Sequence, residues 1–240
     1  MMLNIFGREI SPYAITFIMS FVISYALVYI LLKKKNIPTN IIGYSIITNF
    51  VFCIYGSKMY GVILSGFKEN IFNSGFASLG GAIGLLAGIF IITCIYKEKK
   101  NYLWQAYLAV LPLFYGVSKI GCHIMGCCHG RPYEGPFSIS YNNEFFHTGN
   151  IFPVQITESI VFIFIFCVTI LTYLRNDKYV IGMAFILCGL GKFSLDFLRE
   201  EHIGKILSAN QIICIIFMIL GIYITVKSHR KFKDFSVKVS

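Results

Sequence analysis

Long apolar stretches fill most of this 240-residue chain and limit the folds that it can adopt. Seven of them approach the roughly 20 residues that a helix needs to cross a bilayer core. They cover residues 11–32, 41–66, 75–96, 102–121, 154–174, 180–198 and 208–226, each to within a few residues. One core of this size cannot cover a chain with 56% hydrophobic and 13% charged residues, so lipid must cover part of it. The sequence therefore predicts an all-α, polytopic membrane protein, with about seven transmembrane helices in a single integral membrane domain over residues 1–240.

Basic residues lie between the apolar stretches and alternate from one side to the other. Thirteen of the 21 Lys and Arg residues follow the first, third, fifth and seventh stretch: Lys33, Lys34, Lys35, Lys97, Lys99, Lys100, Arg175, Lys178, Lys227, Arg230, Lys231, Lys233 and Lys238. The opposite loops hold Arg8, Lys68, Arg131, Arg199 and Lys205. The positive-inside rule then predicts an external N-terminus and a cytoplasmic C-terminus with a basic tail at 227–240. Because the net charge of +10 is spread over these loops, we expect no nucleic-acid partner.

Five charged residues remain inside the apolar stretches, where a charge costs at least about 3 kcal/mol on insertion scales. They are Lys58, Lys119, Glu158, Lys192 and Asp196. Lys192 and Asp196 have i, i+4 spacing and would share a helix face, with Arg199 at the outer end of that helix. By topology, four cations can meet near the outer leaflet: Lys119, Arg131, Lys192 and Arg199. This pattern predicts a site for a phosphate anion. The alternative is that these residues reach the interface or form structural ion pairs.

The long outer loop, residues about 122–152, begins with a run rich in cysteine and histidine. Residues 122–129 contain three of the eight cysteines and two of the five histidines. Such a run can bind a soft metal, form a disulfide or thiol redox site, or be a turn of small residues that lets backbones approach. Zinc sites usually need two separated ligand pairs, and the outer face has no second pair of cysteines. We therefore expect no metal and no cofactor, and we favour the packing interpretation.

The run from Ser118 to Arg131 also resembles, without gaps, a signature of the prolipoprotein diacylglyceryl transferase family, G-R-I-G-N-F-I-N-G-E-x-x-G-R. Further family motifs have counterparts in the same order: G-A-R-x-Y at 56–60, H-G-G-x-x-G at 79–84, H-P-x-Q-x-x-E at 152–158, the stretch ending E-x-x-R at 191–199, and S-x-G-Q at 208–211. The resemblance covers nearly the whole chain. The seven spans and outward N-terminus of the family agree with the topology predicted above.

The resemblance implies that a diacylglyceryl group moves from phosphatidylglycerol to the lipobox cysteine of an exported prolipoprotein, at the outer leaflet of a bacterial cell membrane. A thiolate displaces glycerol phosphate in this reaction, so cations must hold the phosphate as its charge develops. The implied headgroup contacts are Lys119, Arg131, Lys192 and Arg199. The implied catalytic residues are Arg199, Lys119, Glu158 and His129, the last two as candidate bases. Asp196 would orient Lys192, and the partners are phosphatidylglycerol, prolipoproteins and membrane lipid.

Several family positions hold other residue types, so the chain resembles a divergent, cysteine-containing member. Leu79 and Phe152 replace histidines, Lys58, Lys119 and Lys192 replace arginines, and Cys122, Met125 and Cys127 replace polar residues. His123 and His129 are new titratable groups that could replace a missing base. Two alternatives stay open. One is a paralogue of the same fold with a redox or acyl-thiol site at Cys122, Cys127 and Cys128. The other is a non-enzymatic lipid or metal binder or transporter, with discontinuous helices near Gly56 and Gly121.

Overall fold

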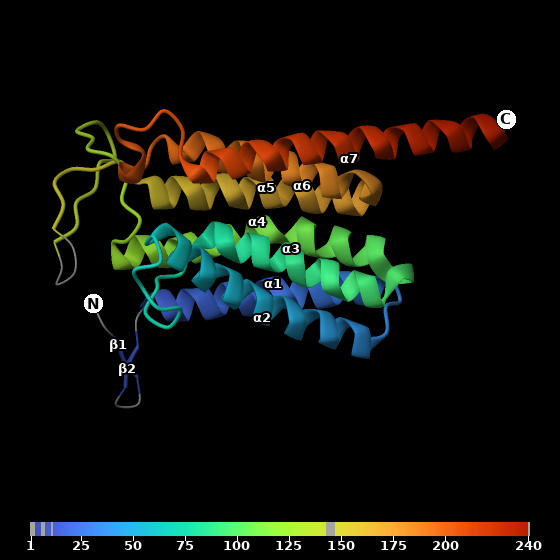
Figure 1. Ribbon diagram of the computed structural model, residues 1–240, viewed down its shortest axis with the longest axis horizontal. Helices are drawn as coiled ribbons and strands as arrows, with labels where there is room; N and C mark the ends of the chain where they lie inside the picture. The colour runs from blue at the N-terminus through green and yellow to red at the C-terminus, as the bar shows by residue number, and fades with distance from the viewer. Residues whose placement is uncertain (1–2, 6–7, 11, 143–146, 240) are drawn as a thin grey trace. The chain divides into compact units, whose positions relative to one another are not determined.

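The computed structural model describes residues 3–5, 8–10, 12–142 and 147–239 of the chain. Within these ranges a short β-hairpin precedes seven α-helices (Figure 1). The elements are β1 (Leu3–Ile5), β2 (Arg8–Ile10), α1 (Pro12–Lys34), α2 (Thr39–Leu64), α3 (Ser78–Ile95), α4 (Lys100–Met125), α5 (Val154–Asn176), α6 (Val180–Asp196) and α7 (Ala209–Val239). The prediction of an all-α fold is confirmed, and the antiparallel hairpin at the N-terminus is an addition that the apolar pattern did not indicate.

Most of these helices have the length and composition of membrane spans. Six of the described helices, α1 to α5 and α7, are long and apolar enough to cross a bilayer. Helix α6 has 17 residues, which is at the lower end of the lengths that span a bilayer. Large apolar side chains are exposed along the helices, for example Phe164 at 68% and Ile219 at 62%. The prediction of a polytopic membrane protein is therefore confirmed.

Helix α4 ends four residues later than the sequence predicted, at Met125 instead of residue 121. A Schellman motif ends it: the Gly126 N–H donates to the His123 carbonyl at 3.2 Å, and the Cys127 N–H donates to the Cys122 carbonyl at 3.1 Å. Gly126 has the left-handed φ of 72° that this motif requires. Cys122 and His123 therefore lie on the helix, and the loop that follows begins at Gly126.

The hypothesis of helices interrupted at Gly56 and Gly121 is wrong, because α2 and α4 are continuous through these positions. Both glycines instead allow neighbouring helices to approach. A Cβ atom at Gly56 would lie 2.9 Å from Gly84 Cα of α3. A Cβ atom at Gly121 would overlap Thr16 Oγ1 of α1. Small residues at helix contacts are a common packing device in membrane proteins.

The helices form two compact units, and residues 25–107 make up one of them. Helices α2 and α3 pack side by side in this unit, together with the later part of α1 and the first turns of α4. The Ser45 hydroxyl lies 2.9 Å from the Tyr107 hydroxyl inside it. Lys58 donates to the carbonyl oxygens of Phe72 at 3.1 Å and Ser74 at 2.6 Å, so this charge is satisfied by the loop between α2 and α3.

The other unit comprises residues 1–24 and 108–240. Helix α6 packs against both α5 and α7, and Phe162, Ile165 and Leu195 form an apolar cluster between α5 and α6. Isolated bridges join the loop that follows α4 to itself, Pro132 and Ile139 each pairing with Ile151. Every residue that the sequence assigned to the phosphate site belongs to this unit.

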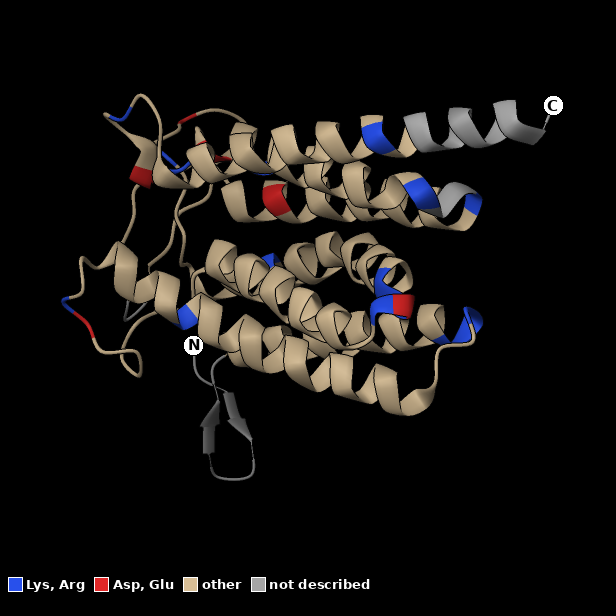
Figure 2. Ribbon diagram, turned by 45° about the vertical axis from the view of Figure 1, so that its right-hand side comes forward, with Lys and Arg blue, Asp and Glu red and all other residues tan. Residues whose placement is uncertain are grey.

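Basic residues gather at the helix ends (Figure 2). Lys33 and Lys34 end α1, and Arg175 and Lys178 lie where α5 gives way to α6. The basic tail predicted at 227–240 is continuous with α7, which runs to Val239. The orientation of the chain across the membrane stays a prediction.

Candidate functional site

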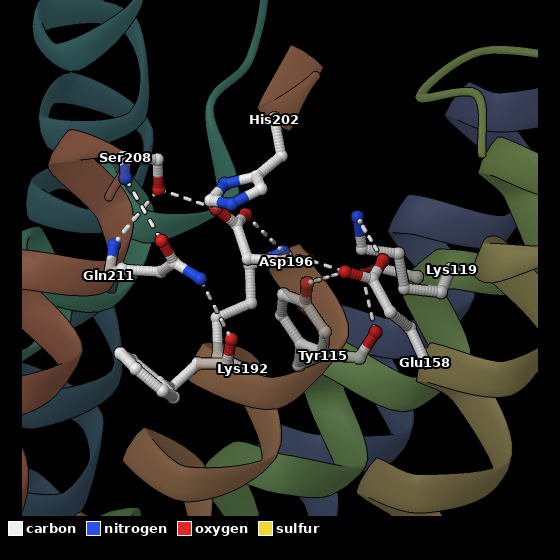
Figure 3. A network of polar contacts seen from close by, with 10 residues as sticks. Tyr115, Lys119, Glu158, Lys192, Asp196, His202, Ser208 and Gln211 are labelled. Atoms are coloured by element: carbon white, nitrogen blue, oxygen red, sulfur yellow. Dashed lines mark hydrogen bonds and ion pairs between the residues drawn. The ribbon is translucent and has the colours of Figure 1, made fainter. Parts of the chain in front are cut away.

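A fully buried carboxylate, Glu158 of α5, lies at the centre of a charged cluster (Figure 3). Its Oε1 accepts hydrogen bonds from Lys192 Nζ of α6 at 2.6 Å and from the Tyr115 hydroxyl of α4 at 3.1 Å. Lys119 Nζ of α4 lies 2.9 Å from Oε2, an ion pair that lacks hydrogen-bond geometry. One carboxylate thus joins three helices through two lysines and a tyrosine.

Helical spacing places these partners on common faces. Tyr115 and Lys119 are four residues apart on α4, as are Glu158 and Phe162 on α5. The Tyr115 ring packs on the Phe162 ring with their centroids 4.2 Å apart. Lys119 Nζ lies 5.0 Å and Lys192 Nζ 5.7 Å from the centroid of the same tyrosine ring. Tyr115 therefore stabilises both lysines through its ring and the carboxylate through its hydroxyl, a role that the sequence analysis missed.

Asp196 extends the cluster by one turn of α6. It lies 4.0 Å from Lys192 Nζ, as the i, i+4 spacing predicted, and 3.9 Å from His202 Nδ1. The Ser208 hydroxyl donates to Asp196 Oδ2 at 2.5 Å. Asp196 thus links Lys192 to the start of α7.

Ser208 and Gln211 form a capping box at the start of α7. The Gln211 N–H donates to the Ser208 hydroxyl at 3.1 Å, and the Ser208 N–H donates to Gln211 Oε1 at 2.9 Å. Gln211 Nε2 also donates to the Phe193 carbonyl at 3.2 Å. The motif at 208–211 therefore fixes α7 against α6 and holds the Asp196 carboxylate in place.

Arg199 follows α6 and is the third buried cation, with 6% of its surface exposed. Burial lowers the pKa of its guanidinium, but nearby negative groups, Glu158 foremost and then Cys128, Tyr115 and Glu201, together outweigh that effect. The pKa is therefore raised above its ordinary value. Arg199 therefore stays charged. Its Nε and Nη2 are buried, and no acceptor within residues 12–142 or 147–239 receives a hydrogen bond from them. Buried donors of this kind are rare without a partner, so these two guanidinium donors fit an anionic ligand.

The backbone ties Arg199 to the loop after α4. Arg199 and Gly130 form an antiparallel bridge, the Arg131 N–H donates to the Leu198 carbonyl at 2.9 Å, and the Glu200 N–H donates to the His129 carbonyl at 3.2 Å. A Cβ atom at Gly130 would overlap the Phe152 carbonyl oxygen. Only glycine therefore fits at this position, where the loop passes close to Phe152.

The structure brings most of the predicted site together. Lys119, Lys192 and Arg199 all lie near Glu158, and Asp196 adjoins Lys192. These three buried cations face two buried carboxylates, which leaves one positive charge in excess. The backbone of Arg131 lies beside that of Arg199 and its side chain is exposed, so three of the four predicted cations are buried together.

His123 at the end of α4 and His129 in the loop contact Tyr141 and Glu200. His129 Nδ1 is 3.7 Å from Glu200 Oε2, and its ring centroid is 6.0 Å from that of Tyr141. His123 Nδ1 is 2.8 Å from the Tyr141 hydroxyl. Burial raises the pKa of Tyr141 to about 12, so its hydroxyl stays protonated at neutral pH and can donate to His123. Tyr141 is a second contact that the sequence analysis missed.

Three thiols gather beside this network. The sulfur atoms of Cys122, Cys127 and Cys128 all lie within 4.8 Å of one another, and Gln155 Nε2 fixes the turn by donating to the Cys127 carbonyl at 2.8 Å. Hydrogen bonds with the other two thiols raise the pKa of Cys127 well above its ordinary value. The same pair of thiols lowers the pKa of Cys128, and Lys119 and Arg199 lower it further. Cys128 is therefore the thiol of the three that ionises most readily.

Comparison with known proteins agrees with the motifs in this site. The family description "Prolipoprotein diacylglyceryl transferase" matches residues 1–227. The chain belongs to this family. The predicted family, and with it an enzyme of the transferase class, is confirmed.

Curated relatives in Clostridium match much of the chain. A phosphatidylglycerol–prolipoprotein diacylglyceryl transferase of Clostridium tetani is 27% identical over 240 residues, covering 92% of this chain and 94% of the relative. Transferase 2 of Clostridium perfringens is 33% identical over 160 residues, covering 63% and 61%. Transferase 1 of the same species is 28% identical over 236 residues, covering 89% and 88%. The similarity to the first and third extends over nearly the full length of both proteins.

Proposed function

We propose that the protein transfers a diacylglyceryl group from phosphatidylglycerol to the lipobox cysteine of exported prolipoproteins. The prolipoprotein thiolate forms a C–S bond with the glycerol carbon, and the bond from that carbon to the phosphate oxygen breaks. Glycerol phosphate leaves with the electron pair. The family match supports this reaction, and one observation carries it: the buried Arg199 fork keeps donors without an acceptor among the described residues, next to two buried lysines.

In this proposal the cations hold the headgroup phosphate and stabilise the charge that develops on it. Arg199 donates from Nε and Nη2 to two phosphate oxygens, and Lys119 acts as a point charge. Lys192 is the weaker contact, because Glu158 and Asp196 both engage it. The exposed Arg131 contacts the headgroup from the solvent side.

Glu158 is assigned a positioning role. Both of its oxygens are engaged, one by Lys192 and Tyr115 and the other by Lys119. A carboxylate held in this way keeps the cations in place before the substrate arrives, so that little reorganisation accompanies the reaction. His129 is then the better candidate for the base that accepts the proton of the substrate thiol.

We further propose that the chain acts as one multi-pass domain in the bacterial cell membrane, with the site toward the outer leaflet. Reporter domains fused after Lys34 or Lys99 are expected to be cytoplasmic, and one inserted at Gly149 external, because basic loops stay inside. Protease protection in sealed vesicles measures this. The reverse pattern would contradict both the orientation and the placement of the site.

The direct test uses purified protein, phosphatidylglycerol labelled in its acyl chains, and a lipobox peptide. We expect a labelled peptide whose mass has increased by one diacylglyceryl group, and no product when the peptide cysteine is replaced by serine. Absence of transfer by folded protein would refute the proposed function.

The thiols of the enzyme are expected to be dispensable for transfer, because the substrate supplies the reacting sulfur. The triple variant Cys122→Ser, Cys127→Ser and Cys128→Ser should keep most of the rate, measured as kcat/KM for the peptide. Serine is close to cysteine in size and is a far weaker nucleophile. Loss of activity in folded Cys127→Ser alone would favour an acyl-thiol or redox mechanism instead.

A further inference from the structure

The cysteine cluster at the end of α4 has no task in the proposed transfer. Cys122 lies one turn before the end of α4, and Cys127 and Cys128 lie in the turn that follows. All three are free thiols, and their sulfur atoms lie within 4.8 Å of one another. The sequence analysis expected no metal because it required a second pair of ligands from elsewhere in the chain. The structure shows that this short segment brings three ligands together by itself.

The backbone holds this arrangement firmly. The Schellman motif folds Cys127 back over the end of the helix, and Gln155 secures the Cys127 carbonyl. Cys128 has a φ of 60°, a left-handed conformation that is unfavourable for a residue with a Cβ atom. Such a conformation persists only where the surroundings enforce it. The three thiols are therefore held in fixed positions close to one another.

We propose that Cys122, Cys127 and Cys128 bind one thiophilic metal ion, with Cu⁺ preferred over Zn²⁺. Thiolate sulfur lies about 2.3 Å from such an ion, so three sulfurs in a plane around it lie about 4 Å apart. The observed separations of up to 4.8 Å reach this geometry through small side-chain rotations. Soft thiolate ligands select Cu⁺ and Zn²⁺ over harder ions.

The ligand number favours Cu⁺. No His, Asp or Glu side chain in the described part of the chain joins the three sulfurs. His123 turns Nδ1 to the Tyr141 hydroxyl, and His129 turns Nδ1 toward Glu200. Structural Zn²⁺ takes four protein ligands, whereas three soft ligands suffice for Cu⁺. Three thiolates around Cu⁺ carry two negative charges, and the buried cations Lys119 and Arg199, which both act on Cys128, offset part of this charge.

Binding is a ligand exchange without electron transfer: each thiol releases one proton to solvent as its sulfur bonds to the ion. The proposal does not depend on the transfer reaction, so either can fail without the other.

The test titrates buffered Cu⁺, without oxygen, into the reduced full-length protein in detergent. Sulfur-to-copper charge-transfer absorbance and copper per chain are measured. We expect one Cu⁺ per chain, and loss of that ion in the triple serine variant of Cys122, Cys127 and Cys128. The matched control carries serine at Cys53, Cys94 and Cys167 and should bind like the unaltered protein. Each single serine variant of the cluster should bind at least about tenfold more weakly, which keeps the test valid if the triple variant does not fold.

Three results would overturn the proposal. The first is that the reduced protein binds no Cu⁺ although all three thiols react with an alkylating reagent. The second is that the serine variants of Cys122, Cys127 and Cys128 bind Cu⁺ as well as the control variant does. The third is that peptide masses show a disulfide within the cluster in protein prepared without reductant, and that this protein takes up no copper after reduction. The cluster would then be a redox pair.

Discussion

Transfer is expected to fall by about 100-fold or more when Arg199 is replaced by Gln. The substitution removes a buried guanidinium whose Nε and Nη2 have no acceptor among the described residues, so few intramolecular contacts are lost with it. In the proposed reaction the same groups stabilise the departing phosphate, which is where a lost donor affects the rate most. The measurement is kcat/KM for a lipobox peptide with labelled phosphatidylglycerol, alongside the elution profile of the folded protein.

Three further variants make the result specific. Arg199→Lys keeps the charge and loses the fork, so its rate should fall between those of the unaltered protein and Arg199→Gln. Arg131→Gln should cost less, because that side chain is exposed. Lys205→Gln changes a nearby exposed cation and should leave the rate unchanged. Full activity in folded Arg199→Gln would contradict the proposal that Arg199 binds the headgroup phosphate.

Replacing Glu158 with Gln is expected to destabilise the protein severely. The substitution removes the carboxylate between Lys119 and Lys192 and leaves two buried ammonium groups that repel each other. Removing one partner of a buried ion pair typically costs about 3–5 kcal/mol. Thermal unfolding in detergent, followed by tryptophan fluorescence or aggregation, should show a much lower midpoint.

A second substitution separates charge balance from packing. Lys192→Gln in the Glu158→Gln background removes one of the two repelling charges, so it should recover part of the lost stability. Glu134→Gln alters an exposed carboxylate and should shift the midpoint little. An unchanged midpoint in Glu158→Gln would show that the cluster does not hold the three helices together.

The sequence predicted the features that depend on local pattern. Apolar length gave the helices, and the four-residue spacing gave the contact between Lys192 and Asp196. The charges within spans identified Glu158 and Lys119, because a charge at that depth requires a partner. The pattern could not show which partner each charge has, since that depends on how the helices pack.

Features that depend on contacts between distant segments were missed. Tyr115 resembles any aromatic residue in an apolar stretch until its hydroxyl is seen on Glu158. The position of Arg131 beside Leu198 and Arg199 follows from a backbone pairing that no local rule indicates. The meeting of the three thiols depends on the left-handed turn at Gly126 and Cys128, and only glycine at 126 gives a hint of it in the sequence.

The backbone pairing of residues 129–131 with residues 198–200 also determines which positions outside the charged cluster are sensitive to mutation. Main-chain bonds to the loop hold the backbone of Arg199, so a shift of that loop would shift Arg199 with it. A side chain at Gly130 would push against the Phe152 carbonyl and displace the loop, and with it the paired backbone of Arg199. A single methyl group at Gly130 would therefore misalign a cation that it never touches.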